Sequence, residues 1–243
     1  MPPRLFVDVP LSAAIQFALP ERAARHVQVL RLQPGDALTL FDGRGGEWSA
    51  EIVAMARRGV EVRTLDAHAR EAELAIVVTL ALAMPANDRM DTLVEKATEL
   101  GVTAIVPLIT ERSVLRLAGE RAERRQAHWQ AIAVAACEQC GRNRVPAIHV
   151  AQTLAAWLAG IGTAADGESR LLLGWRDAQP WPVAAARLVS ALTLLSGPEG
   201  GLSDGEQDLA YLNGFVVASL GARVLRADTA PLAALAAIAV AAA

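Results

Sequence analysis

The chain has 243 residues, of which 53% are hydrophobic and 20% charged, and its formal net charge is -3. This length allows one large domain or two smaller ones, and the composition excludes a disordered protein. The slight acidic excess argues against a protein that binds nucleic acid through its total charge, although a local basic patch is compatible with it.

The N-terminal part of the chain predicts a small barrel. Apolar periodicity indicates one helix and several strands, and residues 42–46, rich in glycine, are typical of a hairpin turn. We expect the helix at 21–32 and strands at 5–7, 37–41, 47–55 and 60–65. Short strands at this spacing suggest a barrel. The polar segment 67–73 predicts a domain boundary.

From residue 74 the pattern changes to strands that alternate with helices. Residues 74–83 form a continuous run that is apolar except for Thr79, as in a parallel strand buried on both faces. We expect further strands at 102–108, 171–174, 192–196 and 215–220, and helices at 88–100, 120–140, from residue 203 and at 231–243. This alternation predicts an α/β domain with a parallel sheet.

Two of these strands end in loops that suit a ligand. Strand 192–196 runs into the glycine-rich segment 197–201, and strand 215–220 runs into 221–226. Glycines let the backbone approach a ligand closely, and open α/β sheets bind ligands outside the carboxyl ends of their strands. The spacing fits neither a P-loop nor a dinucleotide fingerprint, so the ligand stays open. A tight strand-to-helix turn, with a capping box starting at Ser203, is the alternative.

Two groups of charged residues accompany these elements. Arg223 and Arg226 lie on the second loop, and Asp228 follows it. Unpaired charges are costly to bury, so a ligand role or a surface ion pair would explain them. Arg142 and Arg144 follow the helix at 120–140 and suit phosphate contacts, but spacing alone favours a local surface network.

Cys137 and Cys140 stand three residues apart in a helical segment. A zinc ribbon needs four ligands and there is no second cysteine pair, so we expect no metal. Two reduced thiols fit a cytoplasmic protein. Met1 is followed by no signal-peptide run, and the apolar tail is too short to span a bilayer, so we expect no membrane partner.

Short motifs are spread along nearly the whole chain, at 4–6, 26–31, 34–36, 40–43, 96–102, 107–113, 135–146, 197–203 and 220–226. The most specific are Gly-Pro-Glu-Gly-Gly-Leu-Ser at 197–203 and Leu-Gly-Ala-Arg-Val-Leu-Arg at 220–226. Together these motifs resemble the ribosomal RNA small subunit methyltransferase E family of the SPOUT superfamily. The chain departs from the family at Ala222, where proline is usual, and at Asp228, where glutamate is usual.

The resemblance implies a fold and an activity. It implies a PUA-like RNA-binding barrel over 1–70 and a SPOUT α/β methyltransferase domain with a C-terminal trefoil knot over 74–243. The activity would be methylation of uridine N3 in 16S ribosomal RNA with S-adenosylmethionine, by a cytoplasmic homodimer that acts on the small subunit in ribosome biogenesis.

The resemblance also implies site residues. The cofactor would contact Leu195, Ser196, Gly197, Glu199, Gly200, Gly201, Ser219, Leu220, Gly221, Val224, Leu225, Thr229 and Ala230. Asp228 is a candidate base, and Arg223 or Arg226 is a candidate partner for a uridine oxygen. The RNA would contact Arg4, Arg31, Arg142, Asn143, Arg144 and Arg226. Alternatives are another SPOUT RNA methyltransferase, such as a transfer-RNA ribose 2'-O enzyme, and a non-catalytic RNA-binding homologue.

Overall fold

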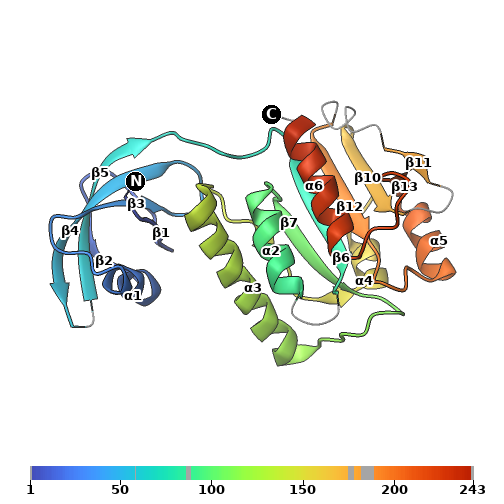
Figure 1. Ribbon diagram of the computed structural model, residues 1–243, viewed down its shortest axis with the longest axis horizontal. Helices are drawn as coiled ribbons and strands as arrows, with labels where there is room; N and C mark the ends of the chain where they lie inside the picture. The colour runs from blue at the N-terminus through green and yellow to red at the C-terminus, as the bar shows by residue number, and fades with distance from the viewer. Residues whose placement is uncertain (1, 58, 86–88, 175–177, 182–188, 242–243) are drawn as a thin grey trace. The chain divides into compact units, whose positions relative to one another are not determined.

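The computed structural model describes residues 2–57, 59–85, 89–174, 178–181 and 189–241. They form two compact units, Met1–Glu73 with Val134–Val145, and Leu74–Ala133 with Pro146–Ala243 (Figure 1). Three predicted features reach outside the described residues: a turn at Arg58, a helix start at Asp88 and a helix end at 242–243.

The first unit is built on a five-stranded sheet. Its elements are β1 (Arg4–Phe6), β2 (Gln16–Ala18), α1 (Glu21–Val29), β3 (Ala37–Phe41), β4 (Glu47–Ala56) and β5 (Gly59–His68). The strand order is β1-β3-β4-β5-β2, with β1 and β3 parallel and the other pairs antiparallel. Helix α1 buries Ala23, Ala24 and Val27 in the same apolar cluster as the strands. The antiparallel pairing of β3 with β4 confirms the predicted hairpin. Strand β2 was not predicted from the sequence.

A buried network of charged side chains supports this unit. Arg4 pairs with Glu47, and its Nη2 donates to Asn143 Oδ1 (2.6 Å) and to the carbonyl of Arg142 (3.2 Å). Arg142 Nε in turn donates to both carboxylate oxygens of Glu73 (3.1 and 3.2 Å). Arg4, Arg142 and Asn143 are 8%, 3% and 0% exposed. These contacts connect segment 134–145 to β1, to β4 and to Glu73, which follows β5 in the same unit.

The lowered pKa of Glu47 predicts that the protein loses stability in acid. Burial alone would raise its pKa, but the hydrogen bond and charge of Arg4, helped by Arg70, outweigh burial and hold the pKa below its ordinary value of 4.5. Glu168 has a lowered pKa too, chiefly through its hydrogen bond from Arg170. Each contribution is complete above pH 4.5 and disappears as the pH falls through the lowered pKa.

We therefore expect the free energy of unfolding to fall steeply below about pH 4.5. The Glu47→Gln variant should be less stable at pH 7 and should lose less stability on acidification. Urea unfolding curves at pH 7, 5, 4 and 3 measure both effects. Parallel pH profiles for the variant and the wild type would contradict the assignment.

The second unit is a three-layer α/β domain with an eight-stranded sheet. Its strands are β6 (Val77–Ala83), β7 (Ala104–Ile109), β8 (Ala147–Ile148), β9 (Gln152–Thr153), β10 (Glu168–Leu173), β11 (Gln179–Pro180), β12 (Ala191–Ser196) and β13 (Val216–Ser219). All pairings are parallel, in the order β11-β13-β10-β12-β6-β7-β8, with β9 also paired to β7. The predicted parallel sheet is confirmed.

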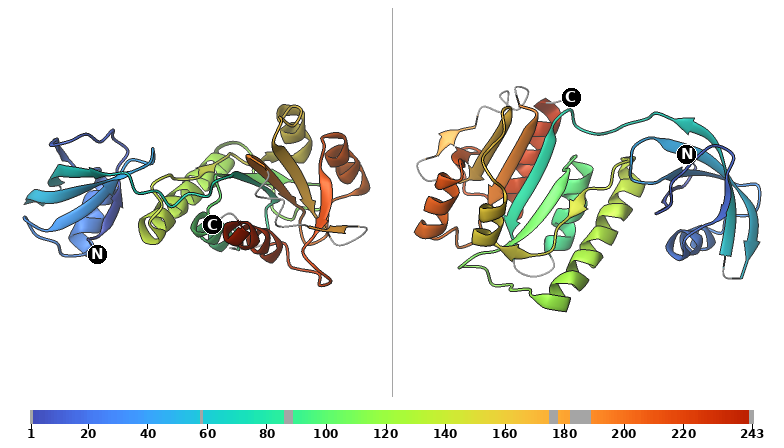
Figure 2. Two further views of the ribbon diagram at one scale, coloured as in Figure 1. Left: turned by 90° about the horizontal axis from the view of Figure 1, so that it is seen from above. Right: turned by 180° about the vertical axis from the view of Figure 1, so that it is seen from behind.

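Helices cover both faces of this sheet. They are α2 (Arg89–Glu99), α3 (Gly119–Cys140), α4 (Leu154–Gly160), α5 (Asp204–Leu212) and α6 (Thr229–Ala241). Helices α2 and α6 pack together on one face, and α4 and α5 pack together on the other (Figure 2). The core under α4 and α5 includes Leu195, Trp157 and Phe215. None of the helices in the described part of the chain is long and apolar enough to cross a membrane.

Candidate active site

A pocket of about 680 Å³ opens at the carboxyl ends of β10 and β12. It is lined by Arg112, Leu172, Leu173, Gly174, Ser196, Gly197, Pro198, Glu199, Gly200, Gly201, Leu202, Asp204, Gln207, Val217, Val224, Leu225, Arg226, Ala227 and Ala230. The volume lies in the range of small-molecule sites, and the position is the one at which open α/β sheets bind ligands.

The first wall of the pocket is the glycine-rich loop after β12. The N–H of Gly201 donates to the carbonyl of Pro198 (2.8 Å), which closes a tight turn, and Gly201 has a φ of +70° that favours glycine. A Cβ on Gly197 would lie 3.2 Å from the backbone nitrogen of Leu202. The loop can follow this close path only because these positions carry no side chain.

A capping box fixes the end of this loop. The N–H of Glu206 donates to Ser203 Oγ (3.3 Å), and the N–H of Ser203 donates to Glu206 Oε2 (3.0 Å). Helix α5 therefore starts as the sequence predicts. The helix start anchors the loop 197–203 at the pocket.

The second wall comes from the loop after β13. Ser219 Oγ accepts from the N–H of Gly221 (3.2 Å) and donates to its carbonyl (3.0 Å), and Gly221 has a φ of +115°. Beyond this turn, Val224 and Leu225 line the pocket. The two loops singled out in the sequence thus border one pocket.

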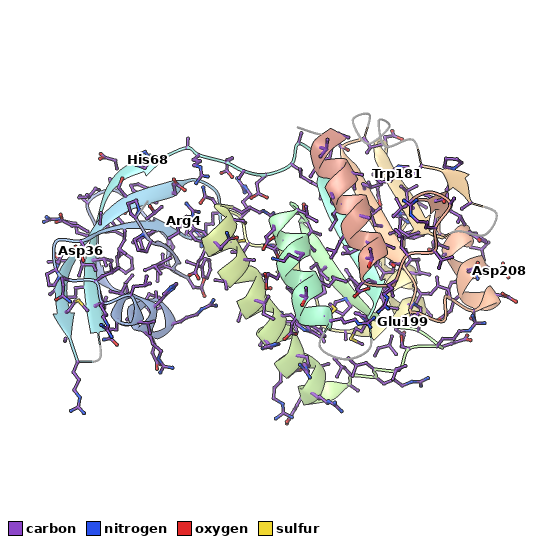
Figure 3. The ribbon with its side chains drawn as sticks, viewed as in Figure 1. Arg4, Asp36, His68, Trp181, Glu199 and Asp208 are labelled. Atoms are coloured by element: carbon purple, nitrogen blue, oxygen red, sulfur yellow. The ribbon has the colours of Figure 1, made fainter. Side chains whose placement is uncertain are left out.

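An arginine on α2 joins the two loops electrostatically. Arg89 Nη1 lies 3.6 Å from Glu199 Oε1 on the first loop, and Arg89 Nε lies 3.9 Å from Asp228 Oδ2 beyond the second. Figure 3 labels Glu199 at this position. Asp228 is half-buried and also accepts from Thr229 Oγ1 (3.4 Å). The sequence did not single out Arg89, because its two partners are distant along the chain.

The predicted cofactor residues divide into two groups. The pocket lining includes Ser196, Gly197, Glu199, Gly200, Gly201, Val224, Leu225 and Ala230, and it omits Leu195, Ser219, Leu220, Gly221 and Thr229. Leu195 is fully buried in the core. The candidate catalytic residues Arg223 and Asp228 are also outside the lining, although their neighbour Arg226 belongs to it.

Residues of other strands line the pocket without having been predicted. Leu172 and Leu173 end β10, which lies between β12 and β13 in the sheet, and Gly174 follows them. Arg112 comes from the loop after β7. Strand order depends on pairing between distant segments, and no local pattern reveals it.

The predicted RNA contacts also divide. Arg31, Arg144 and Arg226 are exposed. The buried side chains of Arg4, Arg142 and Asn143 take part in the internal network of the first unit, whereas the alternative from the sequence was a local surface network. Because these three side chains are buried and hydrogen-bonded within the protein, we propose RNA contacts only at the exposed arginines.

Comparison with known proteins identifies related domains. Residues 72–239 match the family model of an RNA methyltransferase domain, and residues 19–65 match that of an RNA methyltransferase PUA domain.

Across the described residues no group of three or more His, Cys, Asp and Glu side chains gathers as a metal site.

Curated relatives cover most of the chain. The sequence is 37% identical to ribosomal RNA small subunit methyltransferase E of Synechocystis sp. over 214 residues, which are 87% of this chain and 68% of the relative. It is 30% identical to the Bacillus subtilis protein of the same name over 243 residues, 97% of this chain and 95% of the relative.

Solved structures agree in fold. A Neisseria gonorrhoeae ribosomal RNA small subunit methyltransferase E bound to S-adenosyl methionine superposes with a TM-score of 0.90 at 36% identity, covering 98% of this chain and 97% of that one. A Legionella pneumophila structure with the bound cofactor SAM has a TM-score of 0.89 at 32% identity, with the same coverage.

Proposed function

The chain belongs to the ribosomal RNA small subunit methyltransferase E family, and on this premise we propose that it methylates N3 of a uridine in 16S ribosomal RNA. The predicted enzyme class and cofactor are confirmed: the protein is an RNA methyltransferase that uses S-adenosylmethionine. The observation that carries the proposal is the pocket at the strand ends, bordered by the glycine loop and the loop after β13.

The residues present fit this cofactor. S-adenosylmethionine, when bound, supplies a methyl group carried on a positively charged sulfur. The apolar side chains of Leu172, Val217 and Leu225 line the pocket and suit the purine ring. The backbone of 197–201 offers N–H and C=O groups for polar edges. Gly174 lets the backbone lie close to Val217 at the pocket wall, since a Cβ there would lie 2.9 Å from Val217 Cγ1.

The chemistry requires a proton acceptor and a cation. Neutral uridine N3 carries a proton and is a poor nucleophile until that proton leaves. Asp228 accepts the proton, and Arg223 donates to the uridine oxygen on which negative charge develops. Arg89, whose Nε lies 3.9 Å from Asp228 Oδ2, helps to hold the carboxylate in place.

The RNA contacts and the assembly complete the proposal. Residues 1–70 form the RNA-binding PUA-like domain and 74–243 the knotted SPOUT methyltransferase domain of a cytoplasmic homodimer. Exposed Arg31, Arg144 and Arg226 contact phosphates. The small ribosomal subunit is the substrate, and its target uridine is splayed out of the RNA to reach the pocket.

Two substitutions test the catalytic roles. We expect Asp228→Asn and Arg223→Ala to lower the single-turnover methylation rate about 10²- to 10⁴-fold. Binding of S-adenosylmethionine should change little, because neither residue lines the pocket. The matched control is Asp166→Asn, an exposed carboxylate in the turn before β10. Wild-type rates in both variants would refute these roles while leaving the enzyme class intact.

A further inference from the structure

A third loop borders the cofactor pocket and is internally braced. Residues 110–113 follow β7. The N–H of Thr110 donates to Ser113 Oγ (3.0 Å), the N–H of Ser113 donates to the carbonyl of Thr110 (3.1 Å), and the two hydroxyls lie 2.8 Å apart. Thr110 and Ser113 are buried, whereas Glu111 and Arg112 between them are exposed. The turn therefore holds the backbone of Glu111 and the side chain of Arg112 in fixed places.

One carboxylate joins this turn to the glycine loop. Glu206 is 9% exposed, and its Oε2 accepts from the N–H of Ser203 (3.0 Å). Its Oε1 accepts from the N–H of Glu111 (2.9 Å). The two oxygens thus bind backbone groups from two different loops, and neither loop can move without leaving a buried charge poorly solvated.

A second link joins the same turn to the glycine loop through a side chain of the turn. Arg112 Nη1 donates to the carbonyl of Gly200 (2.8 Å) and, more weakly, to that of Leu202 (3.4 Å). Gln207 Nε2 donates to the same Leu202 carbonyl (3.1 Å). A carbonyl and the following N–H belong to one rigid peptide plane, so these bonds fix the direction of the peptide groups that face the pocket.

We infer that Glu206 and Arg112 are positioning residues that clamp the S-adenosylmethionine loop to the turn after β7. The inference rests on the proposed function and adds a third element to the same site. Glycine-rich segments lose the most backbone freedom when they are ordered. A loop that the clamp orders in advance loses less freedom on binding, so the clamp raises cofactor affinity.

Loss of the clamp is expected to change KM and kcat differently. The clamp residues act on the binding loop and not on the reacting atoms, so loss of the clamp raises KM and Kd for S-adenosylmethionine and leaves kcat nearly unchanged. A defect that acted through global unfolding would lower the fraction of active enzyme and hence kcat. The split between KM and kcat therefore reports positioning.

Two variants test the clamp from its two sides. Glu206→Gln keeps the shape but offers one acceptor oxygen in place of two. Arg112→Ala removes the second link, and Arg112→Lys restores part of it. We expect Kd and KM for S-adenosylmethionine to rise about tenfold in the first two variants, equal to about 1.4 kcal/mol, with partial recovery in the third.

The first control lies on the same helix as Glu206, and the second lies on the helix that follows the Arg112 loop. Asp208→Asn lies on α5, like Glu206, and the exposed Asp208 side chain projects from the helix away from the sheet (Figure 3). Arg121→Ala removes an exposed arginine near the start of α3. Both controls should match the wild type within twofold in calorimetric titrations with S-adenosylmethionine and in steady-state methylation of small subunits.

The outcomes separate the clamp from the proposed function. If the wild type binds and uses S-adenosylmethionine while Glu206→Gln and Arg112→Ala bind it equally well, the clamp is overturned and the function stands. If the wild type does not bind S-adenosylmethionine, both are overturned. Should Glu206→Gln fail to fold, Arg112→Ala decides, because that side chain is exposed.

Discussion

Replacing Gly197 by valine is expected to weaken S-adenosylmethionine binding about 100-fold, or about 2.8 kcal/mol, while the protein stays folded. The new Cβ would lie 3.2 Å from the backbone nitrogen of Leu202 and 3.3 Å from its Cγ. Backbone yields less readily than the end of a flexible side chain, so the loop 197–201 must shift into the space of the cofactor. Calorimetric titration measures the loss, and thermal unfolding without ligand measures the fold.

Gly205→Ala is the matched control for this substitution. Gly205 lies in the first turn of α5, and a Cβ there meets no atom within 4 Å. Alanine in a helix is more favourable than glycine by about 0.5–1 kcal/mol, so this variant should be slightly more stable and bind normally. Normal binding by Gly197→Val would contradict the placement of the cofactor at this loop.

The largest expected loss of stability follows from Arg142→Met. The Arg142 side chain is 3% exposed and pairs with Glu73, whose side chain is 20% exposed. Methionine leaves this carboxylate without its cation, and breaking a buried pair from one side costs about 3–5 kcal/mol. For a chain of this size we expect the melting temperature to fall by roughly 6–20 °C.

Arg144→Ala is the control for Arg142→Met. Arg144 pairs with Glu71 at 3.7 Å, but its side chain is 56% exposed, so Arg144→Ala should cost less than about 1 kcal/mol. It should instead weaken RNA binding if it contacts a phosphate. A stable Arg142→Met protein with weakened RNA binding would instead place Arg142 on the RNA surface.

Local sequence patterns predicted much of the fold for physical reasons. The run at 74–83 is largely apolar because most of β6 is buried in the middle of the sheet, between β12 and β7. The Ser203 and Glu206 pair predicted the start of α5 because a capping box is made by residues three apart. Glycine spacing likewise located both loops of the pocket, since a positive φ is needed at Gly201 and Gly221.

What the patterns did not predict depends on contacts between distant segments. Strand β2 has three residues and no buried one, so it leaves little periodicity to detect. The ends of β10 reach the pocket only through the order of strands. Arg4 and Arg142 looked like surface charges because Glu47 and Glu73, their partners, are 43 and 69 residues away. The identity of the cofactor came from family resemblance.

The most direct test of the proposed function is nucleoside mass spectrometry of 16S ribosomal RNA. Small subunits from cells that lack this protein would be incubated with the purified enzyme and methyl-labelled S-adenosylmethionine, then digested to nucleosides. We predict labelled 3-methyluridine, and a strongly reduced yield of it with the Gly197→Val variant at limiting cofactor. Label in a ribose 2'-O-methyl nucleoside, or no label despite cofactor binding, would contradict the proposal.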